Sequence, residues 1–219
     1  MTPWTVVLPV KDAARGKSRL SGIPDAGPAL ARAIALDTIE AVAACAAVAR
    51  VVVVTDDPQL PALLPAGVEV AFDGESGGPN AAVTAVMATI PASEPRAALL
   101  ADLAALRPDE LERALASAAD VDRGVVPDAE TDGSTLVTAR AGVPWASAFG
   151  ASSFERHVAL GCTVLAVPAE SSLRRDVDTP AHFEAAAGLG LGPRTLRWRA
   201  AALSTAGHGQ GRARHSVES

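Results

Sequence analysis

Three aspartates in this chain lie at places where a metal ion could be bound. Asp102 comes directly after residues 96–101, an apolar run typical of a strand buried on both faces. Asp176 and Asp178 flank one valine, so their side chains point to the same side of an extended segment. Carboxylate oxygens are the ligands that Mg²⁺ prefers. The pattern therefore predicts an oxygen-ligand metal site.

Each of these carboxylates also has an interpretation without metal. Asp102 could be an ordinary aspartate of a strand-to-helix loop, since such loops often carry a capping Asp. Asp178 or Thr179 could cap the helix that begins at the next proline, and Asp176 could pair with the arginines that precede it. The spacing alone leaves both interpretations open.

A basic loop follows the apolar run 4–10 and contains Lys11, Arg15, Lys17 and Arg19. Cations gathered at the end of a strand suit a polyphosphate, although charge runs are often only solvated turns. Gly16-Lys-Ser18 matches the end of a Walker A loop. The glycine that should stand five residues earlier is Lys11, which excludes that motif.

Two further stretches could bind a small anion or a base. Asn80 follows a glycine-rich loop at a predicted helix start, where it could cap the helix or offer its amide to a purine edge or phosphate. Ser153 and Arg156 lie at another predicted helix start, which is either an anion site or a serine-capped surface helix.

Alternating strands and helices position these groups in the first part of the chain. Strands are predicted at 4–10, 51–54, 68–72, 96–101 and 124–126, and helices at 29–47, 80–90 and 108–119. This alternation predicts an α/β fold with a mostly parallel central sheet sandwiched by helices. In such sheets ligands bind at the carboxyl ends of the strands.

The pattern changes after Asp128. Strands are predicted at 133–140 and 162–167, a short helix within 149–160, and a helix at 180–187. We expect these elements to form a lid or acceptor-binding region over the first half. A single domain is predicted for residues 1–203, with a disordered polar tail at 204–219.

Composition narrows the class of protein further. The 219 residues carry a net charge of −6, which argues against a nucleic-acid partner. The two cysteines, Cys45 and Cys162, show no metal-ligand spacing, which favours a reducing cytoplasmic setting. No apolar stretch approaches the ~20 residues of a membrane span, so no membrane partner is expected.

The order of motifs resembles the guanylyltransferases that act on phosphoenolpyruvate or 2-phospho-L-lactate in coenzyme F420 biosynthesis. The resemblance runs from Thr5 to about Arg199 and rests on Val10-Lys11, Lys17-Ser-Arg-Leu20, the Asn80 helix start, Asp102-Leu103, Gly133-Ser-Thr135, Phe149-Gly150 with Ser153 and Arg156-His157, and Asp176-Val-Asp-Thr-Pro180. It implies a nucleotidyltransferase fold of the GT-A-like, Rossmann-like type.

The resemblance also implies roles for single residues. Asp102 and Asp176, with Asp178 as a further partner, would hold Mg²⁺. Asp102 and Lys17 would be catalytic. The acceptor would be bound by Thr135, Gly150 and Ser153, and the nucleotide by Lys11, Lys17, Arg19 and Asn80.

The implied reaction transfers GMP from GTP to the phosphate of phosphoenolpyruvate. Alternatives are 2-phospho-L-lactate or 3-phosphoglycerate as acceptor, a molybdopterin or sugar phosphate, and a catalytically silent nucleotide-binding relative. The family usually has Gly-Asp-Leu-Pro where this chain has Ala101-Asp-Leu-Ala104, and often Asn or Gly at Ser134. The sequence leaves the oligomeric state open, with a homodimer as one candidate.

Overall fold

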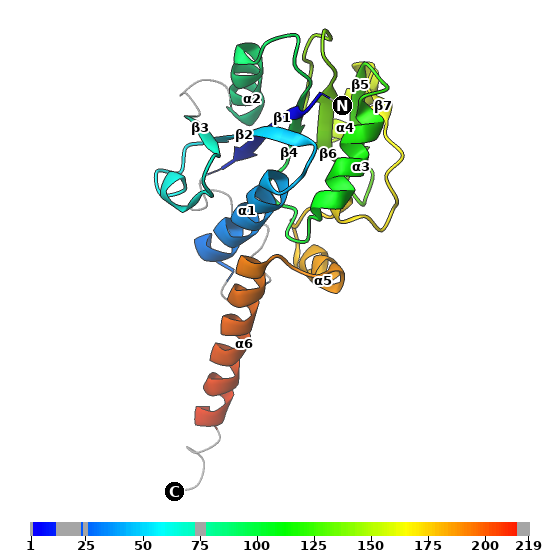
Figure 1. The fold of residues 1–219 in the computed structure, drawn as a ribbon. Helices are drawn as coiled ribbons and strands as arrows, with labels where there is room; N and C mark the ends of the chain where they lie inside the picture. The colour runs from blue at the N-terminus through cyan, green and yellow to red at the C-terminus, as the bar shows by residue number, and fades with distance from the viewer. Residues whose placement is uncertain (1, 12–22, 24–25, 73–77, 214–219) are drawn as a thin grey trace, which may run out of the picture.

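The computed structural model describes residues 2–11, 23, 26–72 and 78–213, with side chains left out at 78, 79 and 205–213 (Figure 1). The strands are β1 (Trp4–Val10), β2 (Val48–Thr55), β3 (Glu69–Phe72), β4 (Arg96–Leu99), β5 (Arg123–Pro127), β6 (Ser134–Ala139) and β7 (Thr163–Val164). The α-helices are α1 (Pro28–Ala43), α2 (Gly78–Thr89), α3 (Pro108–Ala118), α4 (Ser153–Ala159), α5 (Pro180–Leu189) and α6 (Pro193–Ala213), and the 3₁₀ helices are η1 (Pro61–Leu63) and η2 (Ser172–Arg174).

The strands form one seven-stranded sheet in the order β3-β2-β1-β4-β6-β5-β7. Strand pairs β1–β2, β1–β4, β2–β3 and β5–β7 are parallel, whereas β6 is antiparallel to both β4 and β5. The predicted α/β class with a mostly parallel sheet is confirmed. The second half of the chain does not lie over the first as a lid, because β6, β5 and β7 continue the same sheet beyond β4. The alternative of an acceptor-binding region stays a prediction.

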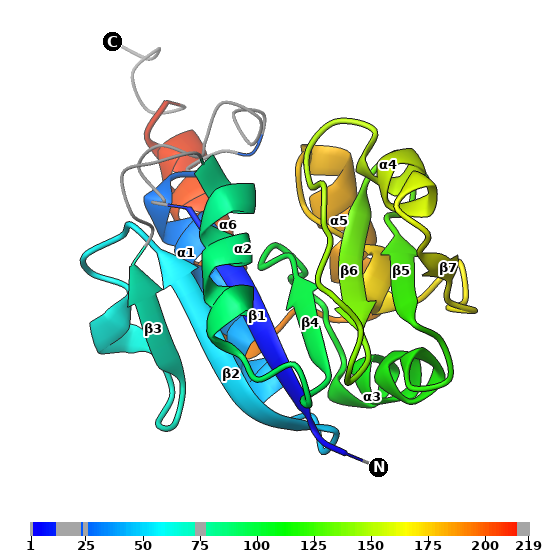
Figure 2. The same ribbon diagram turned by 90° about the horizontal axis from the view of Figure 1, so that it is seen from above.

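Both faces of the sheet are covered by helices, as the uninterrupted apolar strands require. On β1, Val6 and Leu8 pack with α1 and α3, while Val7 lies between them on the opposite face with α2. Figure 2 shows α2 lying over β1 and β2, and α4 beside β5 and β6. Because successive side chains of a strand point to opposite faces of the sheet, each apolar run contributes to two hydrophobic cores, one on each face.

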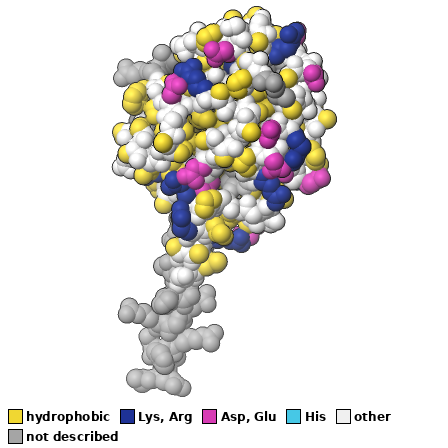
Figure 3. Space-filling view, in the orientation of Figure 1, with side chains coloured by type: hydrophobic (Ala, Val, Ile, Leu, Met, Phe, Trp, Pro, Cys, Tyr) yellow, Lys and Arg dark blue, Asp and Glu magenta, His cyan; other side chains and the backbone are white. Residues whose placement is uncertain are grey.

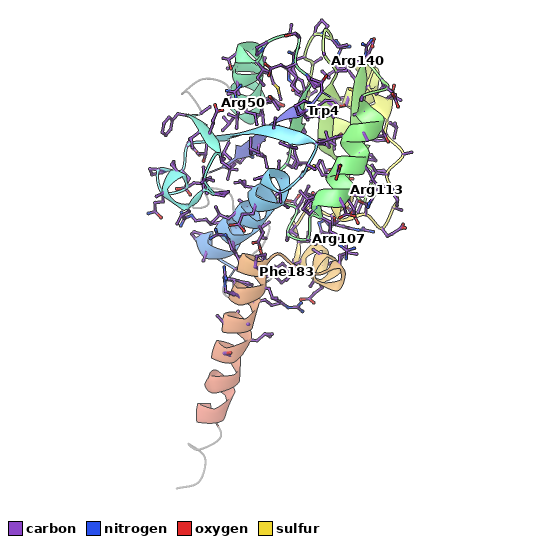
Figure 4. All side chains as sticks on the ribbon, in the orientation of Figure 1. Trp4, Arg50, Arg107, Arg113, Arg140 and Phe183 are labelled. Atoms are coloured by element: carbon purple, nitrogen blue, oxygen red, sulfur yellow. The ribbon has the colours of Figure 1, made fainter. Side chains whose placement is uncertain are left out.

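Helix α6 leaves the body of the molecule after docking on α1 (Figure 1). Asp37 of α1 is buried and accepts hydrogen bonds from the backbone N–H groups of Arg194 and Thr195, at 2.9 and 2.8 Å. Phe183 of α5, labelled in Figure 4, contacts Trp198 edge to face at 6.0 Å between ring centroids. The helical backbone continues to Ala213, so the predicted start of a disordered tail at 204 falls inside α6.

The surface carries charges of both signs. On the face shown in Figure 3, Lys and Arg side chains lie interspersed with Asp and Glu. Within the described ranges, no helix combines the length and the apolar character that crossing a membrane demands.

The predicted strand at 162–167 is much shorter in the structure, because only Thr163–Val164 pairs with β5 before the chain turns toward η2.

Candidate active site

The strand directions bring the predicted polar groups to one edge of the sheet. Strands β1, β4 and β5 run in the same direction and end there, followed by Lys11, Asp102 and Asp128. Strand β6 runs the opposite way, so it begins at this edge with Ser134 and Thr135. The edge therefore collects carboxylates from strand ends and hydroxyls from a strand start.

Asp102 and Asp176 form a carboxylate pair at this edge. The backbone N–H of Val177 donates to the carbonyl of Asp102 at 3.0 Å, which holds the two segments side by side. Asp102 Oδ1 and Asp176 Oδ1 are both buried and have no hydrogen-bond partner among the described residues. Buried carboxylate oxygens are normally hydrogen-bonded, so these two are expected to serve a ligand.

The charges of this pair oppose each other. Burial, followed by the negative charges of Asp176 and Asp178, raises the pKa of Asp102 to about 8. Burial, followed by the charge of Asp128, raises the pKa of Asp176 to about 6. A bound cation would reverse this balance and favour both ionised forms.

The segment that carries Asp176 is held by a carboxylate of α3. Glu110 accepts hydrogen bonds from the hydroxyls of Ser171 and Ser172 and from the Ser172 backbone N–H, at 2.5 to 2.8 Å. Thr135 Oγ1 donates to the Leu173 carbonyl at 2.7 Å. These bonds fix η2 against α3 and β6, and thereby place the following Asp176 beside Asp102.

The structure decides in part between the metal-binding and the metal-free interpretations of residues 174–179. Thr179 caps α5 by accepting a hydrogen bond from the His182 backbone N–H at 3.2 Å. The guanidinium of Arg174 donates to the Asp128 carbonyl and that of Arg175 to the Ala169 carbonyl. Neither arginine is the ion-pair partner of Asp176 that the sequence offered as an alternative.

Asp128 belongs to the same edge, and the sequence did not identify it as a site residue. Asp128, Glu130 and Asp176 place potential ligand oxygens within 4.8 Å of one another. The carboxylate of Asp128 already accepts the backbone N–H groups of Asp132 and Gly133, at 3.1 and 2.6 Å. Its first role is thus to shape the β5–β6 turn. Its position directly after a buried strand, like that of Asp102, was the available signal.

Residues 148–153, called the acceptor loop after the acceptor contacts predicted for Gly150 and Ser153, are anchored at several points. Asn80 Nδ2 donates to the Phe149 carbonyl at 2.7 Å, and Asn80 Oδ1 accepts from the Phe149 N–H at 2.9 Å. His157 Nε2 accepts from the Ala148 N–H at 2.8 Å. Asp132 accepts from the Ser152 hydroxyl at 3.1 Å. The loop is therefore tied to α2, α4 and the β5–β6 turn.

These contacts determine which tautomer the neutral His157 ring adopts. Because a backbone N–H can only donate, Nε2 must be the acceptor and Nδ1 carries the hydrogen, 3.0 Å from Ser134 Oγ. Burial, followed by the charge of Arg156, lowers the pKa of His157 to about 4. The imidazole is completely buried and packs edge to face on Phe149.

The predicted acceptor ligands lie in and beside this loop. Gly150 has φ +122°, a conformation that residues with side chains rarely adopt, and a Cβ added there would lie 3.2 Å from a guanidinium nitrogen of Arg156. Ser153 is buried at the start of α4. Thr135 is also buried, with its hydroxyl already bonded to Leu173. No contact tests the ligand roles of these residues, which stay predictions.

The predicted nucleotide ligands are described only in part. Lys11 is exposed at the end of β1, and its positive charge acts on Asp102. Lys17 and Arg19 lie outside the described residues. The side-chain amide of Asn80 is not directed into open solvent, because its nitrogen and its oxygen are both hydrogen-bonded to the backbone of Phe149. Asp178 is near enough to the carboxylate pair to raise both pKa values.

Comparison with known proteins gives a consistent result. A family model described as the MobA-like NTP transferase domain matches residues 30–171. A phosphoenolpyruvate guanylyltransferase of Thermomonospora curvata is 50% identical over 199 residues, covering 88% of this chain and 86% of the relative. The enzyme of the same name from Streptomyces coelicolor is 49% identical over 198 residues, covering 88% and 93%.

Solved structures agree at the level of fold. The CMP:2-keto-3-deoxy-manno-octonic acid synthetase complexed with CTP superposes with a TM-score of 0.54 at 20% identity, covering 86% of this chain and 98% of the synthetase. At this identity the likeness supports the nucleotidyltransferase fold and nothing finer.

Proposed function

Because the chain belongs to the phosphoenolpyruvate guanylyltransferase family, with its MobA-like NTP transferase domain, we propose that it transfers GMP from GTP to phosphoenolpyruvate. The observation that carries this proposal is the buried carboxylate pair, Asp102 and Asp176, with one unpartnered oxygen on each side chain. A site with this excess of negative charge suits a reaction between anions only when a cation is also bound.

The reaction forms one bond and breaks one. A phosphate oxygen of phosphoenolpyruvate attacks the α-phosphorus of GTP, and the bond between this phosphorus and the bridging oxygen to the β-phosphorus breaks. The products are enolpyruvyl-diphospho-guanosine and pyrophosphate. The attacking phosphate is already ionised at neutral pH, so no strong general base is needed and catalysis rests on positioning and charge.

Asp102 and Asp176, with Asp178 beside them, are the residues that would hold Mg²⁺. The fit rests on the two unpartnered carboxylate oxygens and on the hard oxygen donors that this ion prefers. When bound, Mg²⁺ would neutralise charge on the phosphate oxygens. Asp102 serves as a catalytic residue in this proposal.

Substrate ligands are proposed on both sides of the carboxylate pair. Thr135, Gly150 and Ser153 would bind the phosphorylated acid, which the anchored acceptor loop supports. The nucleotide phosphates would be bound by the basic loop, with Lys17 stabilising the departing pyrophosphate. The residues proposed for the nucleotide phosphates are Lys11, Lys17 and Arg19. Asn80, which the sequence also predicted for the nucleotide, has its amide bonded to the backbone of Phe149 and is not assigned to the nucleotide. We propose that the reaction takes place in the cytoplasm, where both GTP and phosphoenolpyruvate are available.

Pyrophosphate release tests the proposal directly. The purified protein is assayed with GTP and Mg²⁺ against phosphoenolpyruvate, 2-phospho-L-lactate and 3-phosphoglycerate singly, with ATP and CTP as nucleotide controls and chelator as metal control. We expect release with GTP and phosphoenolpyruvate that the chelator abolishes. Release with another acid would change the acceptor, and no release from folded protein with any acid would refute the proposed activity.

A further inference from the structure

The peptide unit between Phe149 and Gly150 is oriented by a side chain from the other half of the sheet. Asn80 lies on α2, which packs on β1 and β2, whereas Phe149 precedes α4. The Asn80 amide bonds both backbone groups of Phe149, at 2.7 and 2.9 Å. A carbonyl and an N–H can be satisfied together by one amide in only one orientation, so the contact fixes the amide as well.

This contact has a consequence for the neighbouring glycine. The Phe149 carbonyl and the Gly150 N–H belong to one planar trans peptide, so they point in opposite directions. Holding the carbonyl toward Asn80 therefore directs the Gly150 N–H away from α2. Among the described residues, none accepts a hydrogen bond from this N–H. Gly150, at φ +122°, also lacks the side chain that would restrict rotation of the peptide.

We infer that Asn80 is a positioning residue that orients the Gly150 N–H for the acceptor, with His157 as the second anchor of the same loop. The inference rests on the proposed function for the identity of the acceptor. His157 fixes the peptide unit between Ser147 and Ala148 through its bond to the Ala148 N–H, and it supports Phe149 through ring contact. This role differs from the nucleotide contact predicted for Asn80 from the sequence, and the two roles have different kinetic signatures.

Substitution of Asn80 separates the two roles. In Asn80→Asp the side chain keeps its shape and accepts from the Phe149 N–H, but it repels the Phe149 carbonyl and favours a flipped peptide. We expect KM for phosphoenolpyruvate to rise about tenfold or more in Asn80→Asp and about three- to tenfold in Asn80→Ala. KM for GTP should stay within about twofold of its original value. Thr84→Ala, an exposed position one turn along α2, is the control.

Two variants at His157 test the second anchor. His157→Gln places a carbonyl oxygen near the position of Nε2 and keeps an acceptor for the Ala148 N–H. His157→Asn keeps a donor toward Ser134 and loses that acceptor. We expect KM for phosphoenolpyruvate to rise clearly in His157→Asn and to stay near the original value in His157→Gln. Equal effects in both variants would remove His157 from the inference.

A readout without turnover keeps the inference testable if the proposed activity fails. The Gly150 amide resonance of ¹⁵N-labelled protein should shift in Asn80→Asp and Asn80→Ala but not in Thr84→Ala. Phosphoenolpyruvate with Mg²⁺ should perturb this resonance in the unaltered protein and less in the Asn80 variants. A rise in KM for GTP alone, or an unchanged Gly150 resonance in folded Asn80→Asp, would overturn the inference. Absence of pyrophosphate release from the unaltered protein would instead overturn the proposed function.

Discussion

The acceptor loop and the carboxylate pair lie at the same edge of the sheet, but their polar groups are satisfied very differently. In the loop, both backbone groups of Phe149 and the N–H of Ala148 are bonded to buried or half-buried side chains. In the pair, one oxygen of Asp102 and one of Asp176 are buried without a hydrogen-bond partner among the residues that the structure describes. One region is arranged by internal hydrogen bonds, and for the other we propose a bound cation.

This difference assigns different physical roles to the two regions. The loop is preorganised, so its groups need little rearrangement when a substrate binds. The pair is destabilising by itself, because burial and like charges raise the pKa of Asp102 to about 8 and that of Asp176 to about 6. Changes in the loop should therefore alter acceptor binding, whereas changes in the pair should trade activity against stability.

Replacing one charge of the pair should give the largest effect. We expect Asp102→Asn to lower kcat by about a thousandfold, a size typical for loss of a central electrostatic group. The metal-free variant should melt at a higher temperature at neutral pH, because asparagine does not carry the free-energy cost of holding a buried carboxyl whose pKa is raised to about 8. Mg²⁺ should stabilise the unaltered protein and not the variant, measured by thermal denaturation with and without the ion.

Asp120→Asn, at an exposed position after α3, is the control for this substitution. It should leave kcat, melting temperature and the response to Mg²⁺ unchanged. A folded Asp102→Asn protein that keeps full activity would remove Asp102 from the mechanism.

A side chain at Gly150 should damage the loop without affecting the pair. Gly150→Ala forces alanine to φ +122° and puts its Cβ 3.2 Å from the Arg156 guanidinium. We expect kcat/KM for phosphoenolpyruvate to fall about thirtyfold or more, with a loss of about 1–2 kcal/mol in the free energy of unfolding. Gly161→Ala is the matched control, since Gly161 has φ +84° with open space around it. If kcat/KM for phosphoenolpyruvate fell equally in both variants, the Gly150 effect would be backbone strain in general and not damage to the acceptor loop.

The neutral histidine predicts a stability change with pH. The pKa of His157 lies below its unfolded value, so the unfolded chain binds the proton more readily and stability falls as pH drops from about 6.5 toward 4. Between pH 7.5 and pH 5 this amounts to about 2 kcal/mol. Urea unfolding at the two pH values should show a smaller loss in His157→Gln, which has no titrating ring. The same loss in both proteins would assign the pH effect to other groups.

The smallest expected change comes from one hydroxyl at the end of the loop. Ser153→Ala should raise KM for phosphoenolpyruvate about threefold and leave KM for GTP unchanged, as befits one hydrogen bond to an anion. Steady-state kinetics with each substrate varied in turn measures this split. An unchanged acceptor KM would contradict the proposed role of Ser153 and place acceptor binding on the rest of the loop.

The sequence predicted the parts of this molecule whose cause is local. Apolar runs such as Val51–Val54 identify strands because both faces of the sheet are covered. Asp102 could be singled out because it directly follows an apolar run, and Asp176 because it and Asp178 flank one valine of an extended segment. Thr179 as a helix cap also follows from residues within one turn.

Other features depend on contacts that local patterns do not encode. The direction of β6 and its place between β4 and β5 follow from tertiary packing, since a strand run reads the same in either direction. The Asn80–Phe149 contact joins residues 69 positions apart. Helix α6 was missed because its apolar residues are few, and its start is capped by Asp37, a residue of α1. Asp128 resembled an ordinary turn residue, which it also is.

The reversed direction of β6 allows the regions that we propose for the two substrates to be altered separately by protein engineering. The β5–β6 turn lies at the edge of the sheet that carries the carboxylate pair and leads into Ser134 and Thr135, and the strands that it connects are β5 and β6. Its length and composition can therefore be varied while the chain path of β1, β2 and β3 stays the same. A library confined to residues 129–131, with Asp128, Asp132 and Gly133 retained, would test whether this turn influences the proposed choice of acceptor, because a Cβ at Gly133 would collide with Asp128 and Asp132 anchors Ser152.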